Sequence, residues 1–461
     1  MTLDVANNVA RQALLASQMQ LALSGRNVAA AGDPARSRVS AELVTTVDGG
    51  VRIQSIRRGE DAAIYQRMIA ATAATAERDA ALMHLETLSQ SVGDPELGTA
   101  IGAMIGDLQT ALADYANSPD DPLFGRTVIE RARDVTDKLN AAASQMLLLR
   151  EEADDAIHAS VTEVNRLLAE YHEVNTQIVI GTNLGHDITM DLDRRDGIVA
   201  ELSAHIGVTT IARDDNDQAL FTDGGISLYD DGAREVRFER TAVYTASTVG
   251  GYIFVDDMPI TGADAPMPST TGSIVGHAYI RDEVVPAFEL QMDEIARELT
   301  AIFDDGLGSL FVHGGGPDYA GTIAIAPDVD PLQGGVVENL RDGTGNPSGY
   351  AAYADRLLAL GEALETVATF DPASELSQEA TILDFAAESA GWVERLRQGV
   401  DIDATAQAAI LLQTSDALSR ETGVNLDDEY ARQLVIERSF QASSRLIGII
   451  DEMFDTLLGI V

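Results

Sequence analysis

The 461-residue chain has no cysteine, one lysine, one tryptophan and few aromatic residues. Without cysteine, disulfides, thiolate catalysis, iron–sulfur clusters and cysteine-ligated zinc are excluded. Lys138 is the sole lysine, and no glycine-rich loop surrounds it, which argues against a phosphate-binding loop and a Schiff-base enzyme. Aromatic residues make up 5% of the chain, so the flat aromatic surfaces that usually hold sugars are scarce.

Positive charge is also scarce. The chain carries 74 Asp and Glu against 31 Lys and Arg, for a formal net charge of −43. Such a surface repels nucleic-acid backbones and anionic membranes. No apolar run approaches the roughly 18–20 residues of a membrane-spanning helix, and the N-terminus lacks the basic and apolar regions of a secretory signal. These features predict a cytoplasmic protein or one exported by a route without a cleaved signal.

Residues that could carry catalysis or bind metal are present but not grouped. The seven histidines form no metal-binding pair, and no nucleophile motif of the GxSxG or SxxK type occurs. The run Asp214-Asp215-Asn216-Asp217 lacks the Gly and Glu that a calcium loop requires at its sixth and twelfth positions. Carboxylate pairs are expected by chance in so acidic a chain. The sequence therefore predicts no enzyme, no cofactor and no metal site.

Helices with a coiled-coil spacing are expected at both ends of the chain. Along residues 3–31 one face alternates steps of four and three residues, and Asp33-Pro34 ends the pattern. That face carries Leu3, Asn7, Ala10, Leu14, Ser17, Leu21, Ser24 and Val28. The C-terminal face carries Ile436, Phe440, Ser443, Ile447, Ile450, Phe454, Leu457 and Val461. Because a lone helix cannot bury such a stripe, the two terminal helices are expected to pair.

Between the termini the pattern is helical, apart from a β-rich stretch at 206–330. There, short β-branched runs alternate with Asp, Gly and Asn turns, which is typical of antiparallel strands. Helix breaks are expected at Gly93-Asp94-Pro95 and at Ser118-Pro119. The predicted domains are a coiled-coil helix plus hairpin at 1–60, a helical domain formed by 61–205 and 331–422, a β domain at 206–330, and a coiled-coil helix at 423–461. The predicted fold class is mainly α, with a helical-bundle middle domain and the inserted antiparallel β domain at the tip.

Short motifs near both termini resemble those of bacterial flagellar axial proteins. The C-terminal motif reads Thr422-Gly423-Val424-Asn425-Leu426-Asp427-Asp428-Glu429 and continues with Phe440-Gln441-Ala442-Ser443. Near the N-terminus, Asn27-Val28-Ala29, Pro34 and Ser37-Arg38 are similar to the family's motif, from which Ala30, Gly32, Asp33, Ala35 and Arg36 depart. Leu192-Asp193-Arg194-Arg195-Asp196 resembles a third family segment. The Gly-Val-Asn-Leu-Asp run favours the hook–filament junction proteins among these.

The resemblance implies a structural subunit of the flagellum that is found outside the cell. Members leave by the flagellar type III export apparatus, and a cytosolic chaperone holds their C-terminal segment. They form a helical homo-oligomeric layer that contacts the hook protein and a second junction protein. The residues expected to serve assembly are Leu3, Leu14, Leu21, Asn27, Arg38, Asp193, Arg195, Asp196, Gly423, Val424, Asn425, Leu426, Asp427, Glu429, Phe440, Gln441, Ala442, Ile447, Ile450, Phe454 and Leu457.

Two alternatives stay open on the sequence alone. One is another axial protein, such as a hook protein or a flagellin-like subunit. The other is an enzyme or ligand-binding module housed in the central β region, although no group of residues supports it. Arg195 and Asp196 are further expected to be able to form salt bridges between subunits, each worth about 0–1 kcal/mol if exposed.

Overall fold

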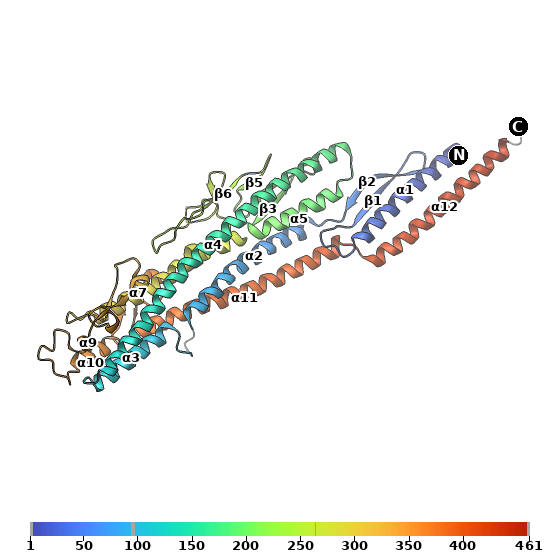
Figure 1. Ribbon diagram of the computed structural model, residues 1–461. Coiled ribbons are helices and arrows are strands. Elements are labelled where there is room, and N and C mark those ends of the chain that lie inside the picture. The colour runs from blue at the N-terminus through green and yellow to red at the C-terminus, as the bar shows by residue number, and fades with distance from the viewer. Residues whose placement is uncertain (1–2, 94–96, 263, 459–461) are drawn as a thin grey trace. The chain divides into compact units, whose positions relative to one another are not determined.

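The computed structural model describes residues 3–93, 97–262 and 264–458, and its chain forms two compact units (Figure 1). Unit 1 comprises Met1–Thr75, Glu163–Val236 and Gln407–Val461, and unit 2 comprises Ala76–Thr162 and Arg237–Ala406. The helices α2 (Ala62–Val92), α4 (Pro122–Leu184) and α11 (Ile382–Thr422) contribute residues to both units.

Unit 1 brings the two ends of the chain together. Its helices are α1 (Leu3–Ala30), α5 (Thr189–His205) and α12 (Leu426–Leu458), besides parts of the three shared helices. Its strands are β1 (Val39–Thr45), β2 (Val51–Arg58), β3 (Val208–Ala212), β4 (Gln218–Thr222) and β5 (Ser227–Tyr229). The first two form an antiparallel hairpin with a register shift at Glu42/Leu43, and β3-β4-β5 form an antiparallel sheet. The hairpin packs on α1, which itself packs on α12.

Unit 2 contains parts of the three shared helices and, among its described residues, six helices of its own. These six are α3 (Ile101–Asn117), α6 (Ser273–Tyr279), α7 (Val285–Phe303), α8 (Tyr319–Thr322), α9 (Glu338–Asp342) and α10 (Asp355–Ala363). The unit is built around α3, the first part of α4, and α7. Short strands accompany them: β7 (Ile253–Val255), β8 (Met258–Pro259), β9 (Phe311–Val312), β10 (Ala324–Ile325), β11 (Ala368–Thr369) and β12 (Glu379–Ala380). β6 (Val236–Phe238) pairs with β7, and its residues divide between the units.

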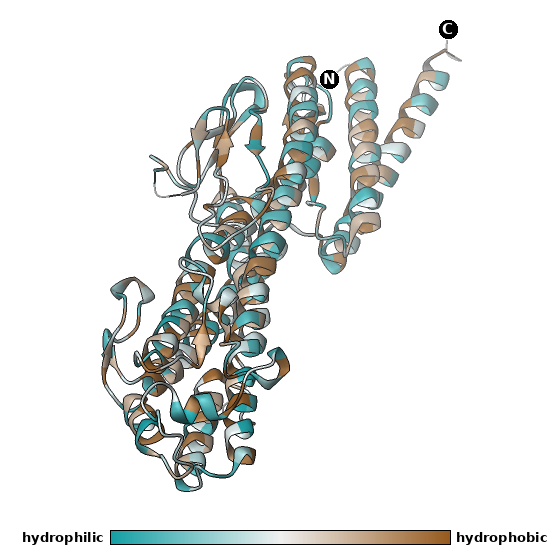
Figure 2. Ribbon diagram, turned by 60° about the vertical axis from the view of Figure 1, so that its left-hand side comes forward, coloured by the Kyte–Doolittle hydropathy of each residue, from teal (hydrophilic) through white to brown (hydrophobic). Residues whose placement is uncertain are grey.

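The core of unit 2 follows from helical spacing of apolar residues. Leu108, Leu112 and Tyr115 recur on one face of α3 and are fully buried, as are Phe303 of α7 and Phe311 of β9. The two phenylalanine rings meet edge to face with centroids 5.2 Å apart. Unit 2 therefore holds a continuous apolar core of its own. In Figure 2 brown apolar positions alternate with teal polar ones along the helices, α12 included.

The predicted fold class is confirmed: the chain is mainly helical, its strand pairs of known register are antiparallel, and its terminal helices pair. The expected break at Ser118-Pro119 separates α3 from α4, and Asp121 accepts a hydrogen bond from the Leu123 N–H there. Asp94 and Pro95, at the other expected break, lie outside the described residues. The strands between 206 and 330 divide over both units as small separate sheets, with α6 and α7 among them.

Candidate assembly interface

Helices α1 and α12 lie side by side and form one seam (Figure 1). On α12 the inward positions step by four and three, and Glu429, Ile436 and Ile450 are buried. The inward positions that are partly buried are Gln433, Phe440, Ser443, Ile447 and Phe454. The side chain of Leu457 and the whole of Val461, which continue the spacing, lie outside the described set. The α12 side of the seam is thus regular from the first turn to Phe454.

The facing side of α1 follows part of the stripe that the sequence indicates. Its buried residues are Ala10, Ala16, Ser17, Leu23, Ser24 and Asn27, of which Ala10, Ser17 and Ser24 belong to that stripe. The Ser17 hydroxyl lies 3.5 Å from the Ser439 hydroxyl of α12. Leu3 and Leu14 are partly buried, and Leu21 is 37% exposed. The hairpin β1–β2 packs on a further flank of α1.

Asn27 ties the end of α1 to the first strand. Its Nδ2 donates to the Val39 carbonyl at 2.8 Å, and the Val39 N–H donates to Asn27 Oδ1 at 2.9 Å. A side-chain amide can satisfy both backbone groups at once because it carries a donor and an acceptor. The two bonds close the turn between α1 and β1, in which Gly32 has a φ of 91°. Asn27 therefore sets where the hairpin starts relative to α1.

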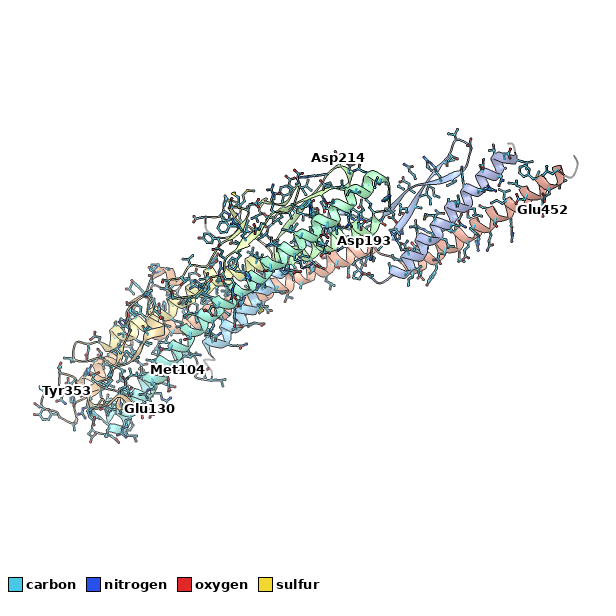
Figure 3. All side chains as sticks on the ribbon, turned by 45° about the horizontal axis from the view of Figure 1, so that its top comes forward. Met104, Glu130, Asp193, Asp214, Tyr353 and Glu452 are labelled. Carbon is cyan, nitrogen blue, oxygen red and sulfur yellow. The ribbon has the colours of Figure 1, made fainter. Side chains whose placement is uncertain are left out.

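Arg58, at the end of β2, forms a buried ion-pair node with helix α5. Its guanidinium lies 3.2 Å from an Asp193 oxygen and 2.6 Å from an Asp196 oxygen, and its side chain is 9% exposed. Burial lowers the pKa of Arg58, but the charges of Asp196 and Asp193 outweigh it and raise that pKa overall. Asp193, which Figure 3 labels, also accepts the Ser37 N–H, so the node joins the turn after α1, the hairpin and α5.

The other charged residues of the α5 motif also have partners within the chain. Arg195 is buried and donates to Asn175 Oδ1 at 2.9 Å and to the Asn216 carbonyl at 2.6 Å. The Tyr65 hydroxyl donates to the Asp196 carbonyl, and burial raises the pKa of the Asp196 carboxyl despite Arg58. Arg195 and Asp196 therefore have partners within unit 1, and a salt bridge between subunits at either residue stays a prediction.

The base of α12 is fastened to α1 and to the hairpin. Glu429 is 1% exposed and accepts the Ser24 hydroxyl at 2.7 Å, with the Arg38 guanidinium 4.0 Å away. The Arg38 N–H donates to the Thr422 carbonyl at 2.7 Å. A carboxylate in the first turn of a helix is stabilised by the helix dipole. This contact makes the docking of α12 depend on α1 and on the strand that follows it.

The turn between α11 and α12 is shaped by two of the motif residues. Asn425 caps α12, since its Oδ1 accepts the Asp427 N–H at 2.9 Å. A Cβ on Gly423 would lie 2.3 Å from the Ser419 carbonyl oxygen, so only glycine fits there. Val424 is partly buried.

Other motif residues point outward. Leu426, Gln441 and Ala442 are exposed, as is Asp427. The C-terminal motif thus contains inward residues that hold the pair and outward ones that the chain itself leaves uncovered.

Arg58 is a residue whose role here the sequence does not single out, whereas Ser24 lies on the face of α1 that the sequence indicates. Arg58 ends an alternating strand, where an arginine usually faces solvent, and its partners lie 135 and 138 residues further along. In the described part of the chain, no three His, Asp or Glu side chains are placed to hold a metal ion. None of its helices has the length and apolar character that crossing a membrane requires.

Comparisons with known proteins agree with this architecture. The family model described as flagellar hook-associated protein FlgK helical domain matches residues 85–308, and the flagellar basal body rod FlgEFG protein C-terminal model matches residues 418–460. The flagellar hook-associated protein 1 of Bacillus subtilis (strain 168) is 22% identical over 511 aligned residues, covering 97% of this chain and 96% of that protein.

Two partial similarities accompany these. The flagellar hook-associated protein 1 of Escherichia coli (strain K12) is 22% identical over 232 residues, which is 48% of this chain and 42% of that protein. The solved flagellar hook junction protein FlgK from Burkholderia pseudomallei superposes with a TM-score of 0.45 at 22% identity, covering 54% of this chain and 47% of that one.

Paired terminal helices and a separate helical unit, together with these matches, define a structural component of the flagellar axis rather than an enzyme. Within that class, the chain is similar to the FlgK hook-associated proteins, through the helical-domain model at residues 85–308 and through the alignment over 97% of its length.

Proposed function

We propose that this chain forms the subunit layer that joins the hook to the filament, and that it assembles through the paired helices α1 and α12. One observation carries the proposal: the two helices bury one face against each other and leave a second apolar face exposed on each. On α1 that face includes Leu15 at 64% exposure, and on α12 it includes Ile449 at 54%. Such faces on paired helices indicate further helices as partners.

The helical match favours the junction role over that of other axial proteins. The rod-protein model matches only the C-terminal 418–460, whereas the hook-associated model matches 85–308. The partners that follow are further copies of this chain, the hook protein below and a second junction protein above. The site residues contribute in two ways. Asn27, Arg38 and Glu429 position the pair, while the exposed motif residues of α12 are free to meet neighbours.

Localisation tests this role directly. Cells lacking the gene should make hooks without filaments and release flagellin into the medium, and the intact gene should restore filaments. Gold-labelled antibody should mark a single band at the hook–filament boundary. Label spread along the hook or along the filament would instead identify a hook protein or a flagellin-like subunit.

A substitution in the seam tests the pairing. Ile450→Asp places a charge at a position that is 3% exposed, so the helices should separate and the variant should not be incorporated. Leu412→Asp in α11 is the matched control, because Leu412 is 65% exposed and a charge there remains in water. Normal filaments in cells carrying Ile450→Asp would contradict assembly through the pair.

Export precedes assembly in this proposal. The chain leaves the cell through the flagellar type III apparatus with α1 and α12 unpaired, and a cytosolic chaperone covers the apolar residues of α12 until then. The support is the amount of apolar surface on α12, both inward and outward. Tagged full-length chain should retain a cytosolic protein from its own cells, and a chain lacking 426–461 should not. Equal retention by both would rule out a chaperone on this segment.

A further inference from the structure

Two buried histidines meet between the helices α2 and α6 of unit 2, and the proposed function does not use them. His84 of α2 is 3% exposed and His277 of α6 is 7% exposed. His84 Nε2 lies 3.0 Å from His277 Nδ1, and the two rings stand edge to face with their centroids 5.1 Å apart. In the neutral pair, one ring donates this hydrogen bond and the other accepts it. The contact joins residues that are 193 positions apart in the chain.

The two helices approach each other closely beside the pair. A Cβ on Gly276 would lie 2.2 Å from the Glu77 carbonyl oxygen and 3.0 Å from the Ala80 Cβ, so α6 rests on the backbone of α2. The start of α6 also lies close to α4, since the Ser273 hydroxyl is 3.4 Å from the Ser160 hydroxyl. A charge added to either ring therefore lacks most of the hydration that it has in water.

The charged residues of α2 and α11 beside the pair already contact each other. Glu77 lies seven residues before His84 and so on the same face of α2. Its carboxylate is 3.3 Å from the Arg78 guanidinium, which also lies 3.9 Å from Asp403 of α11. Glu77 therefore has a cationic partner while both histidines are neutral.

Further charged groups belong to α4 and to η2 (Ile280–Val284), a turn of π-helix that continues α6 into α7. Arg281 of this turn is fully buried, and its guanidinium lies 2.8 Å from Asp154 of α4 and 2.8 Å from Asp282. Besides His277, the other ionisable groups of α6 and η2 are Tyr279 and the exposed Glu283. Asp154 and Asp282 are thus also bound to a cation before a histidine takes up a proton.

Protons change the pair in two steps. A first proton can be shared, because an imidazolium still donates to a neutral imidazole, but it places a charge between two packed helices. A second proton removes the acceptor, so two N–H groups and two positive charges then face each other. Once α6 has left α2, both rings are hydrated and regain a pKa of about 6.5. Because burial lowers the pKa of His84, the stability that the contact contributes is complete above about pH 6.5 and is lost as the pH falls.

We propose that His84 and His277 form an acid-sensitive joint, which holds α6 on α2 near neutral pH and releases it as the pH falls below about 6. The open state binds more protons than the closed one, so each pH unit below about 6 favours it by up to about tenfold for each proton. The joint lies within unit 2 and does not depend on the assembly function. In a subunit exposed to the medium, it makes the cohesion of unit 2 respond to the external pH.

Amide hydrogen exchange on the full-length chain tests the joint. Opening of α6 is compared with opening of α3, in the core of unit 2, after correction for the chemical exchange rate at each pH. Between about pH 6 and about pH 5, the ratio of α6 opening to α3 opening should rise at least about tenfold. This window avoids Asp293, whose pKa of about 7 leaves its carboxyl protonated throughout.

A double variant removes both titrating rings. His84→Gln with His277→Gln keeps a donor and an acceptor on each side chain, but neither amide takes up a proton in this range. In this variant the ratio should stay within about twofold between the same pH values. His158→Gln, at an exposed position of α4, is the matched control and should keep the full response.

Each other outcome overturns the joint. A ratio in the natural chain that stays constant would mean that the pair takes up no proton on closing or opening. A ratio that falls in acid would mean that Glu77 pairs with a protonated ring and strengthens the contact. A response that persists in the double variant would place the titrating groups elsewhere. If the double variant is already open at about pH 7, the natural chain and His158→Gln decide: the joint requires the same tenfold rise in both.

Discussion

Unit 2 and the terminal pair α1–α12 are both helical, but they are stabilised in different ways. In unit 2, Leu85, Tyr115, Leu139, Phe288 and Phe303 are at most 1% exposed and belong to one core. Along the described α12, by contrast, only Glu429, Ile436 and Ile450 are buried. A single seam between two helices buries little of each, so the pair depends more than unit 2 does on polar contacts such as those at its base.

This difference separates a unit that is held by its own core from a pair that is held by one seam. Because the seam buries few residues, the two terminal helices open at a lower cost in free energy than the core of unit 2 does. Amide hydrogen exchange on the isolated chain should therefore be slow in α3 and α7 and much faster in α1 and α12.

The largest expected effect is in the core of unit 2. Phe303→Ala removes a fully buried ring and should lower the free energy of unfolding by about 3–5 kcal/mol. Fluorescence of Trp392, the one tryptophan, reports on this unit because its side chain packs against the same core. The matched change Phe454→Ala removes a half-buried ring from the seam, and its effect should be about 1–2 kcal/mol. Equal losses would mean that the seam is packed like a core.

The node at Arg58 ranks next. Arg58→Ala leaves Asp193 buried without its cation, which should destabilise unit 1 by about 2–4 kcal/mol, as Asp196 keeps some contact with water. Hydrogen exchange in β1, β2 and α5 is the measurement. Arg57→Ala is the neighbouring control, because Arg57 is 71% exposed and its pair with Glu42 should be worth about 0–1 kcal/mol. If both changes had the same effect, the hairpin would not depend on the node.

The contrast between the units also explains how far the sequence predicts the structure. Periodicity predicts the α12 seam correctly from Ile436 to Phe454, because a helix that meets one partner shows that partner's spacing. On α1 it indicates the buried Ala10, Ser17 and Ser24 but not Ala16, Leu23 and Asn27, which are also buried. The reason is that α1 packs on the hairpin as well as on α12, and a repeat of seven residues describes one partner only.

The polar contacts are less predictable, since they join residues far apart in the chain. Nothing near Arg195 in the sequence indicates that the turn carbonyl of Asn216 lies against it. Asn27 is found through a family motif, but its role depends on where Val39 returns after the turn. The local sequence pattern therefore predicts the secondary structure and one helical interface. The ion-pair nodes can be recognised only in the folded chain, because their residues are far apart in the sequence.

A smaller effect is expected at the end of α1. Asn27→Ala leaves the buried Val39 N–H and carbonyl without partners and should destabilise the turn by about 1–3 kcal/mol. The exposed Asn8 of the same helix is the control, and Asn8→Ala should be close to neutral. Exchange of the β1 amides reports the difference. Protection in β1 that is unaltered by Asn27→Ala would separate the hairpin from α1.

The smallest effect concerns pH and lies within unit 2. Burial, together with the charges of Asp318 and Glu289, raises the pKa of Asp293 to about 7, although the Ala320 N–H donates to its carboxyl at 2.7 Å. The folded unit then holds a proton that the unfolded chain releases above about pH 4. This contribution to stability is complete below that pH and is lost as pH rises through about 7.

Asp293→Asn should remove about 1 kcal/mol of the difference in stability between about pH 6 and about pH 8. The exposed Asp304→Asn should leave the difference unchanged, and fluorescence of Trp392 during urea unfolding measures both. Hydrogen exchange in α12 should not follow this transition, because Asp293 belongs to the core of unit 2. A parallel change in α12 would mean that the two regions unfold together.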